Sequence, residues 1–141
     1  MKMIPFTSMA ALLLLAGAGC TLVRSSGNDE AKVVARILAR TAPTTLVFKD
    51  QPGAQQLVSS LDTSEYFDFG VILDSQRQVF ASYFRPDQIS KKEKLLARVT
   101  QPPTSDRSEA VIVDQGLAIA IVPMKINQQI VGYVAVGRKR S

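Results

Sequence analysis

The side chains that most often carry catalysis or bind metals are scarce in this sequence. The 141 residues include no His and a single Cys. The commonest general base at neutral pH and the imidazole ligands of zinc and copper are therefore missing. Ser59, Ser60 and Asp62 bring hydroxyls near a carboxylate, but no recognised motif places a base beside them to activate a serine. The sequence predicts no enzyme, no metal site and no cofactor.

The one thiol, Cys20, ends an N-terminal segment that is typical of bacterial export signals. Lys2 is followed by an apolar run and then by small residues directly before the cysteine, which is the order found in signal peptides. Residues 17–20, GAGC, resemble the lipobox of bacterial lipoproteins, in which the thiol receives diacylglycerol and becomes the mature N-terminus. Lipoboxes favour Leu where this sequence has Gly17. We expect residues 1–20 to form the export signal and Cys20 to carry lipid.

Two other interpretations of this segment stay open. Residues 3–23 contain no charged side chain, and at about 1.5 Å per residue a helix of this length spans roughly 31 Å, enough for an uncleaved membrane anchor. Ordinary cleavage after Ala18 would instead release a soluble protein. All of these interpretations place the rest of the chain on the periplasmic side of the cell envelope. Thr21 follows the cysteine where Asp would favour inner-membrane retention, so we expect the outer membrane for a lipidated chain.

The remaining residues predict a short tether, 21–29, and one domain, 30–137. Apolar residues at helical spacing predict an amphipathic N-terminal helix that ends near Pro43, and Asp50 is expected to cap a second helix. Period-two patterning predicts a hairpin around the turn at residues 74–77. The helix and strands expected after this hairpin cover about 88–99, 109–114, 117–126 and 129–137.

The N-terminal helix is expected to bury one apolar face and to turn its basic residues outward. The expected buried residues are Ala31, Val34, Ile37 and Leu38. The expected outward residues are Lys32, Arg36 and Arg40. An apolar face of this kind packs on a sheet or pairs two copies of the chain.

Five strands with helices before and between them predict an α+β fold, an antiparallel sheet with helices packed on one face. The segments ARTAPTTLVFKDQPGAQQLVSSL, FDFGVILDSQRQVFASYFRP and VPMKINQQIVGYVAVG resemble the periplasmic PAS-like sensor domain of the CHASE8 type, found in membrane-bound diguanylate cyclases and histidine kinases. The resemblance covers about residues 30–137. In that family transmembrane helices flank the domain and an output domain follows. Here only residues 138–141 follow, so we expect a basic tail and a sensor without its own output domain.

Aromatic residues gather on the predicted first hairpin. In a PAS-like fold one sheet face lines a cavity beneath the helices, so the resemblance implies that Phe67, Phe69 and Tyr83 contact a ligand. Core packing is the alternative for aromatic residues on strands. Arg85 follows the second strand, where its guanidinium is expected to reach an anionic ligand. The alternatives for this arginine are a solvated position at the strand end and a surface ion pair with Asp68 or Asp74, which bracket the first strand.

The charge and the resemblance together indicate a binding protein. The net charge of +5 is modest and spread along the chain, unlike the basic stripe of a nucleic-acid binder. We predict an extracytoplasmic sensor-type module that binds a small ligand or a periplasmic protein and modulates a signalling partner. Expected partners are membrane lipid through Cys20 or residues 3–23, a periplasmic regulator protein, a receptor kinase or cyclase, and a second copy through the N-terminal helix. An interaction-only envelope lipoprotein and a truncated receptor fragment are the alternatives.

Overall fold

The computed structural model describes residues 27–101 and 109–139. Cys20, the predicted export signal and the alternative anchor at residues 3–23 lie outside the described residues. Within the described ranges, no helix is both long enough and apolar enough to cross a membrane.

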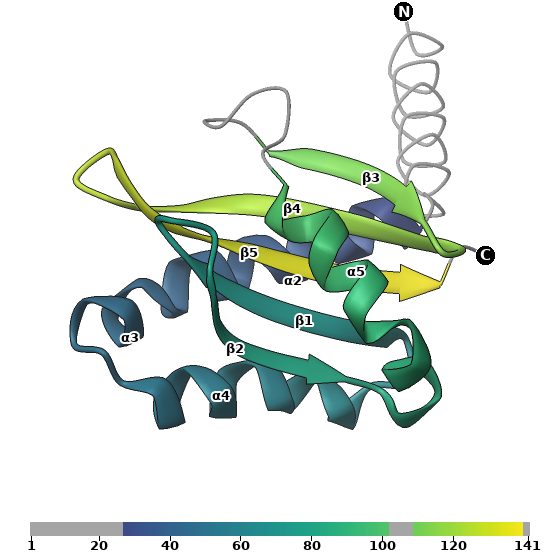
Figure 1. Ribbon diagram of the computed structural model, residues 1–141. Helices are drawn as coiled ribbons and strands as arrows, with labels where there is room; N and C mark the ends of the chain where they lie inside the picture. The colour runs from purple at the N-terminus through teal and green to yellow at the C-terminus, as the bar shows by residue number, and fades with distance from the viewer. Residues whose placement is uncertain (1–26, 102–108, 140–141) are drawn as a thin grey trace, which may run out of the picture.

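The strands form one five-stranded antiparallel sheet in the order β2-β1-β5-β4-β3 (Figure 1). Their bounds are Phe67–Asp74 for β1, Val79–Phe84 for β2, Ala110–Asp114 for β3, Leu117–Ile126 for β4 and Gln129–Lys139 for β5. Because β5 pairs with both β1 and β4, the end of the chain joins the first hairpin to the last. This sheet confirms the predicted α+β, PAS-like fold class. Strand β5 runs beyond the predicted end at Gly137, so Arg138 and Lys139 belong to the sheet.

The helices follow the predicted order with two local differences. Their bounds are Gly27–Thr41 for α2, Pro43–Val47 for α3, Gln51–Ser59 for α4, Ser60–Thr63 for the 3₁₀ helix η1, Pro86–Lys91 for the 3₁₀ helix η2 and Lys92–Thr100 for α5. The predicted cap is present, since the Asp50 carboxylate accepts a 3.0 Å hydrogen bond from the backbone N–H of Gly53. The differences are the additional helix α3 and the 3₁₀ start of the third predicted helix. In both, a proline begins the helix, where its missing N–H costs nothing.

Helices cover both faces of the sheet, whereas the sequence predicted helices on one face. Helices α2 and α4 cover one face and α5 lies on the other (Figure 1). The central strands explain this difference, because successive residues of β1 such as Val71 and Ile72 are all buried and belong to opposite cores. A sheet that is apolar on both faces needs a cover on each of them.

Helix α2 packs on the sheet through small side chains. Its buried residues include Ala31, Ala35 and Leu38, whereas Val33 is 50% exposed and Ile37 is 55% exposed. The expected burial of Ile37 is therefore wrong. The alanines let the helix lie close to the strands, whereas Val33 and Ile37 point away from them.

Candidate functional site

A β-bulge in β1 decides where the predicted site residues lie. Phe67 pairs with Arg138 of β5 and Phe69 pairs with Gly137, so Asp68 is an extra residue without a partner on β5. Such a residue bends the strand and changes the direction of the side chains on either side of it. Phe67 and Phe69 consequently belong to cores on opposite faces of the sheet.

The three aromatic residues predicted to contact a ligand do not share one face. Phe67 is buried and Tyr83 half-buried in the core beneath α2 and α4. Phe69 is fully buried beneath α5, where its ring stacks on Phe84 with ring centroids 5.2 Å apart. The expectation of a shared face is corrected by the bulge, because period-two patterning assumes an uninterrupted strand. All three side chains help to fill the two cores.

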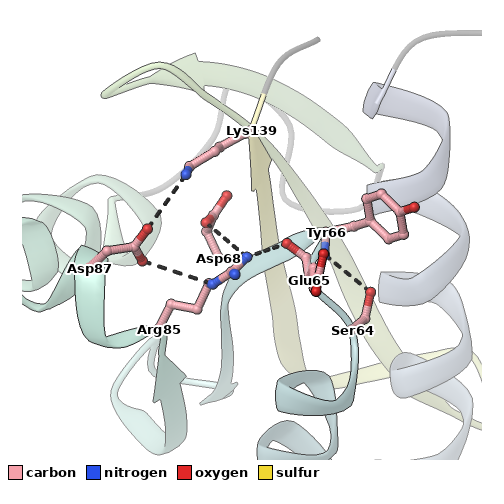
Figure 2. A network of polar contacts seen from close by, with 7 residues as sticks. All are labelled: Ser64, Glu65, Tyr66, Asp68, Arg85, Asp87 and Lys139. Atoms are coloured by element: carbon pink, nitrogen blue, oxygen red, sulfur yellow. Dashed lines mark hydrogen bonds and ion pairs between the residues drawn. The ribbon is translucent and has the colours of Figure 1, made fainter.

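The bulge also places a carboxylate inside the protein. The side chain of Asp68 is fully buried, and no described side chain forms a hydrogen bond with either of its oxygens. Nη1 of Arg85 lies 3.8 Å from Oδ1 of Asp68 (Figure 2). Burial raises the pKa of Asp68 above its ordinary value of 3.8, although the positive charges of Lys139 and Arg85 and a hydrogen bond from the backbone of Lys139 act to lower it. The predicted ion pair with Arg85 is present, but its acidic member is buried.

Arg85 is engaged within the protein by groups from several elements. Its Nη1 donates a hydrogen bond to the backbone carbonyl oxygen of Glu65, and its Nε lies 3.9 Å from Oδ1 of Asp87 (Figure 2). Nζ of Lys139 lies 3.5 Å from the other oxygen of Asp87. This polar cluster, formed by Asp68, Arg85, Asp87 and Lys139, joins the ends of β2 and β5 to the start of η2. Arg85 therefore has a structural role in holding these ends together.

A groove of about 610 Å³ lies elsewhere, between α2 and β4. Its lining residues are Arg36, Ala39, Arg40, Pro43, Glu109, Val122, Pro123 and Lys125. Small-molecule sites in proteins have volumes of roughly 300–1,000 Å³, so the size suits a small ligand. None of the four residues predicted to contact a ligand lines this groove.

One wall of the groove is an ion pair between α2 and the residue before β3. Nε and Nη2 of Arg36 donate hydrogen bonds of 2.7 and 2.6 Å to the two carboxylate oxygens of Glu109. These bonds hold the pKa of Glu109 below its ordinary value of 4.5, and the charge of Lys32 acts in the same direction. The two-point geometry is the one in which a guanidinium recognises a carboxylate most specifically.

Two further cations line the groove without such a partner. Arg40 and Lys125 are both exposed, and neither forms an ion pair or side-chain hydrogen bond with the part of the chain that the structure describes. The groove therefore carries a local excess of positive charge. The described residues contain no group of three or more His, Cys, Asp or Glu side chains that could hold a metal ion.

Comparison with known families assigns this fold. Residues 23–137 match CHASE8, a periplasmic sensor domain. The chain belongs to the CHASE8 family. The match covers most of the chain and confirms both the resemblance seen in the sequence and an extracytoplasmic location. CHASE8 is a sensor domain rather than a catalytic one. No curated protein matches the chain.

The groove of this CHASE8 domain was not predicted from the sequence. Arg36 and Glu109 are 73 positions apart, and only the packing of α2 beside β4 brings them together. Two signals were available. Arg36 and Arg40 lie one helical turn apart on one face, and Pro123 removes one backbone N–H from β4. Neither signal predicts a groove unless the packing of α2 beside β4 is known.

Proposed function

We propose that this CHASE8 domain binds a small ligand in the groove between α2 and β4 and that α2 passes the change to a signalling partner. The proposal rests on the positively charged residues that line the groove. Arg40 and Lys125 line it from two different elements and have no partner in the described ranges. The volume of the groove and these two cations support the binding of a small ligand there.

Helix α2 connects the groove to the end of the domain where both described termini lie. Arg36 and Arg40 line the groove near the C-terminal end of α2, and near its other end Glu30 forms an ion pair with Arg138 of β5. Figure 1 shows the start of α2 beside the end of β5. A ligand that moves α2 therefore also acts on the end of the helix that follows the proposed anchor.

We propose lipid at Cys20 as that anchor, in the outer membrane, with an uncleaved segment at residues 3–23 as the alternative. The support is the order of basic, apolar and small residues before the cysteine. Metabolic labelling with a palmitate analogue should mark the native chain and not the Cys20→Ser variant. Absence of label from both proteins, with the chain still in the membrane fraction, would favour the uncleaved segment.

The exposed apolar side chains of α2 support a protein partner. Val33 and Ile37 lie one turn apart and are half-exposed, so they offer a contact to a second copy, to a periplasmic regulator protein, or to a receptor kinase or cyclase. An interaction-only envelope lipoprotein is the second candidate function, favoured by this same face. Val33→Ser/Ile37→Ser should lower the apparent mass of the chain in analytical ultracentrifugation if the partner is a second copy.

A thermal-shift screen of the full chain in detergent tests ligand binding in the groove. We expect at least one small metabolite to raise the melting temperature, and the rise to disappear in Arg40→Gln/Lys125→Gln. Lys49→Gln/Lys94→Gln is the matched control, because it removes two exposed positive charges that do not line the groove. A rise that survives in the groove variant would contradict the site. No rise with any metabolite, together with a protein captured from periplasmic extract, would favour the interaction-only function.

A further inference from the structure

Resting on the proposed function, we infer that the groove between α2 and β4 is a site for a small organic carboxylate with an apolar body. Two features lead to this ligand class: the balance of charges on the walls and the apolar surface between them. Neither feature alone is sufficient, because exposed ion pairs are weak and small apolar surfaces occur all over a protein.

The charge balance of the groove favours an anion. Its lining includes Arg36, Arg40 and Lys125 but one carboxylate, that of Glu109. Glu109 accepts hydrogen bonds from Nε and Nη2 of Arg36. The charges of Glu109 and Arg36 therefore neutralise each other. The excess positive charge comes from Arg40 and Lys125. An anion bound by these two side chains would neutralise it.

The floor of the groove between these cations is apolar but small. It is formed by Ala39, Pro43, Val122 and Pro123, each of which is almost fully buried. Pro123 lacks a backbone N–H, so this residue offers no main-chain donor to a polar ligand. An inorganic anion would leave this small apolar floor in water, whereas a ligand with a hydrocarbon or aromatic body would cover it.

Glu109 acts in this site as a built-in competitor. Its carboxylate already occupies the Arg36 fork with two hydrogen bonds, which shows that the wall accepts a carboxylate in the two-point geometry. A ligand carboxylate therefore meets one wall whose cation is neutralised. Replacing Glu109 with Gln removes that negative charge, and the groove should then bind an acid more tightly.

Isothermal titration calorimetry of the full chain in detergent, with benzoate and hexanoate as probes, tests the ligand class. The matched neutral probes are benzamide and hexanamide, and inorganic phosphate is the anion without an apolar body. We expect at least one of the acids to bind, with its amide and phosphate at least tenfold weaker. Affinity for the acid should fall as salt is added, because exposed charges are screened.

Variants of the same chain locate the site. Arg40→Gln/Lys125→Gln should weaken binding of the acid at least tenfold, Glu109→Gln should strengthen it severalfold, and Lys49→Gln/Lys94→Gln should leave it unchanged. No binding of either acid, equal affinity for acid and amide, or undiminished binding in Arg40→Gln/Lys125→Gln would overturn the carboxylate class. A neutral metabolite whose binding is lost in that variant would overturn the ligand class alone and leave the proposed function standing. Thermal unfolding of each variant checks that its fold is intact.

Discussion

The buried carboxylate of Asp68 makes the stability of the domain depend on pH. In the unfolded chain this group has a pKa near 3.8, and burial raises the pKa in the folded state. The folded protein therefore binds the proton more tightly than the unfolded chain. The stabilisation from this proton is complete below 3.8 and is lost as the pH rises through the raised pKa of the folded state.

Asp68→Asn should therefore raise the melting temperature at neutral pH and reduce its change between acid and neutral pH. The amide keeps the shape of the side chain and removes a buried charge that has no hydrogen bond from a side chain in the described ranges. Asp62→Asn, at an exposed position, is the control. Lower stability of Asp68→Asn at neutral pH would mean that the attraction to Lys139 and Arg85 outweighs the cost of burial.

Single residues also show where prediction from the sequence ends. An approach of Asp68 or Asp74 to Arg85 was expected, because the two carboxylates bracket the first strand, and the structure has Asp68 3.8 Å from Arg85. The burial of Asp68 was not expected. It depends on the pairing of Phe67 and Phe69 with β5, a strand far away in the chain, and no local pattern reports that pairing.

Among the elements, those whose signals are local were predicted well. Asp50 caps α4 as expected, and the hairpin turn is held by Asp74, whose Oδ1 accepts hydrogen bonds of 2.9 Å from the backbone N–H groups of Gln76 and Gln78. The face that α2 buries was predicted less well. Hydrophobic periodicity predicted that large side chains such as Ile37 would be buried. The structure instead buries the alanines, because they allow the helix to pack closely on the sheet.

The contact between β1 and β5 leads to a prediction for Gly137. This glycine pairs with Phe69, and a Cβ atom at position 137 would overlap the Phe69 ring. Gly137→Ala should destabilise the domain by about 1–3 kcal/mol, as overpacking of a core does. Chemical denaturation measures this loss. Phe69→Leu in the Gly137→Ala background should cost less than in the native chain, and strictly additive losses would contradict the steric explanation.

At the scale of the whole molecule, the fold class and the family followed from the order of elements, but the layers and the groove did not. Both faces of the sheet are covered because β1, β4 and β5 are buried on both sides. The groove arises where the second half of α2 meets β4 and Glu109, which are distant in the sequence. The sequence predicts each of these elements, but it does not predict the tertiary contacts between them.

Hydrogen–deuterium exchange of the full chain, with and without a metabolite that stabilises it, tests most directly whether a ligand in the groove is sensed through α2. We expect slower exchange in α2 around Arg40 and in β4 around Lys125, together with a change at the first turn of α2 near Glu30. Protection confined to α5 and the strands beneath it would contradict sensing through α2, because the ligand would then lie on the opposite face of the sheet.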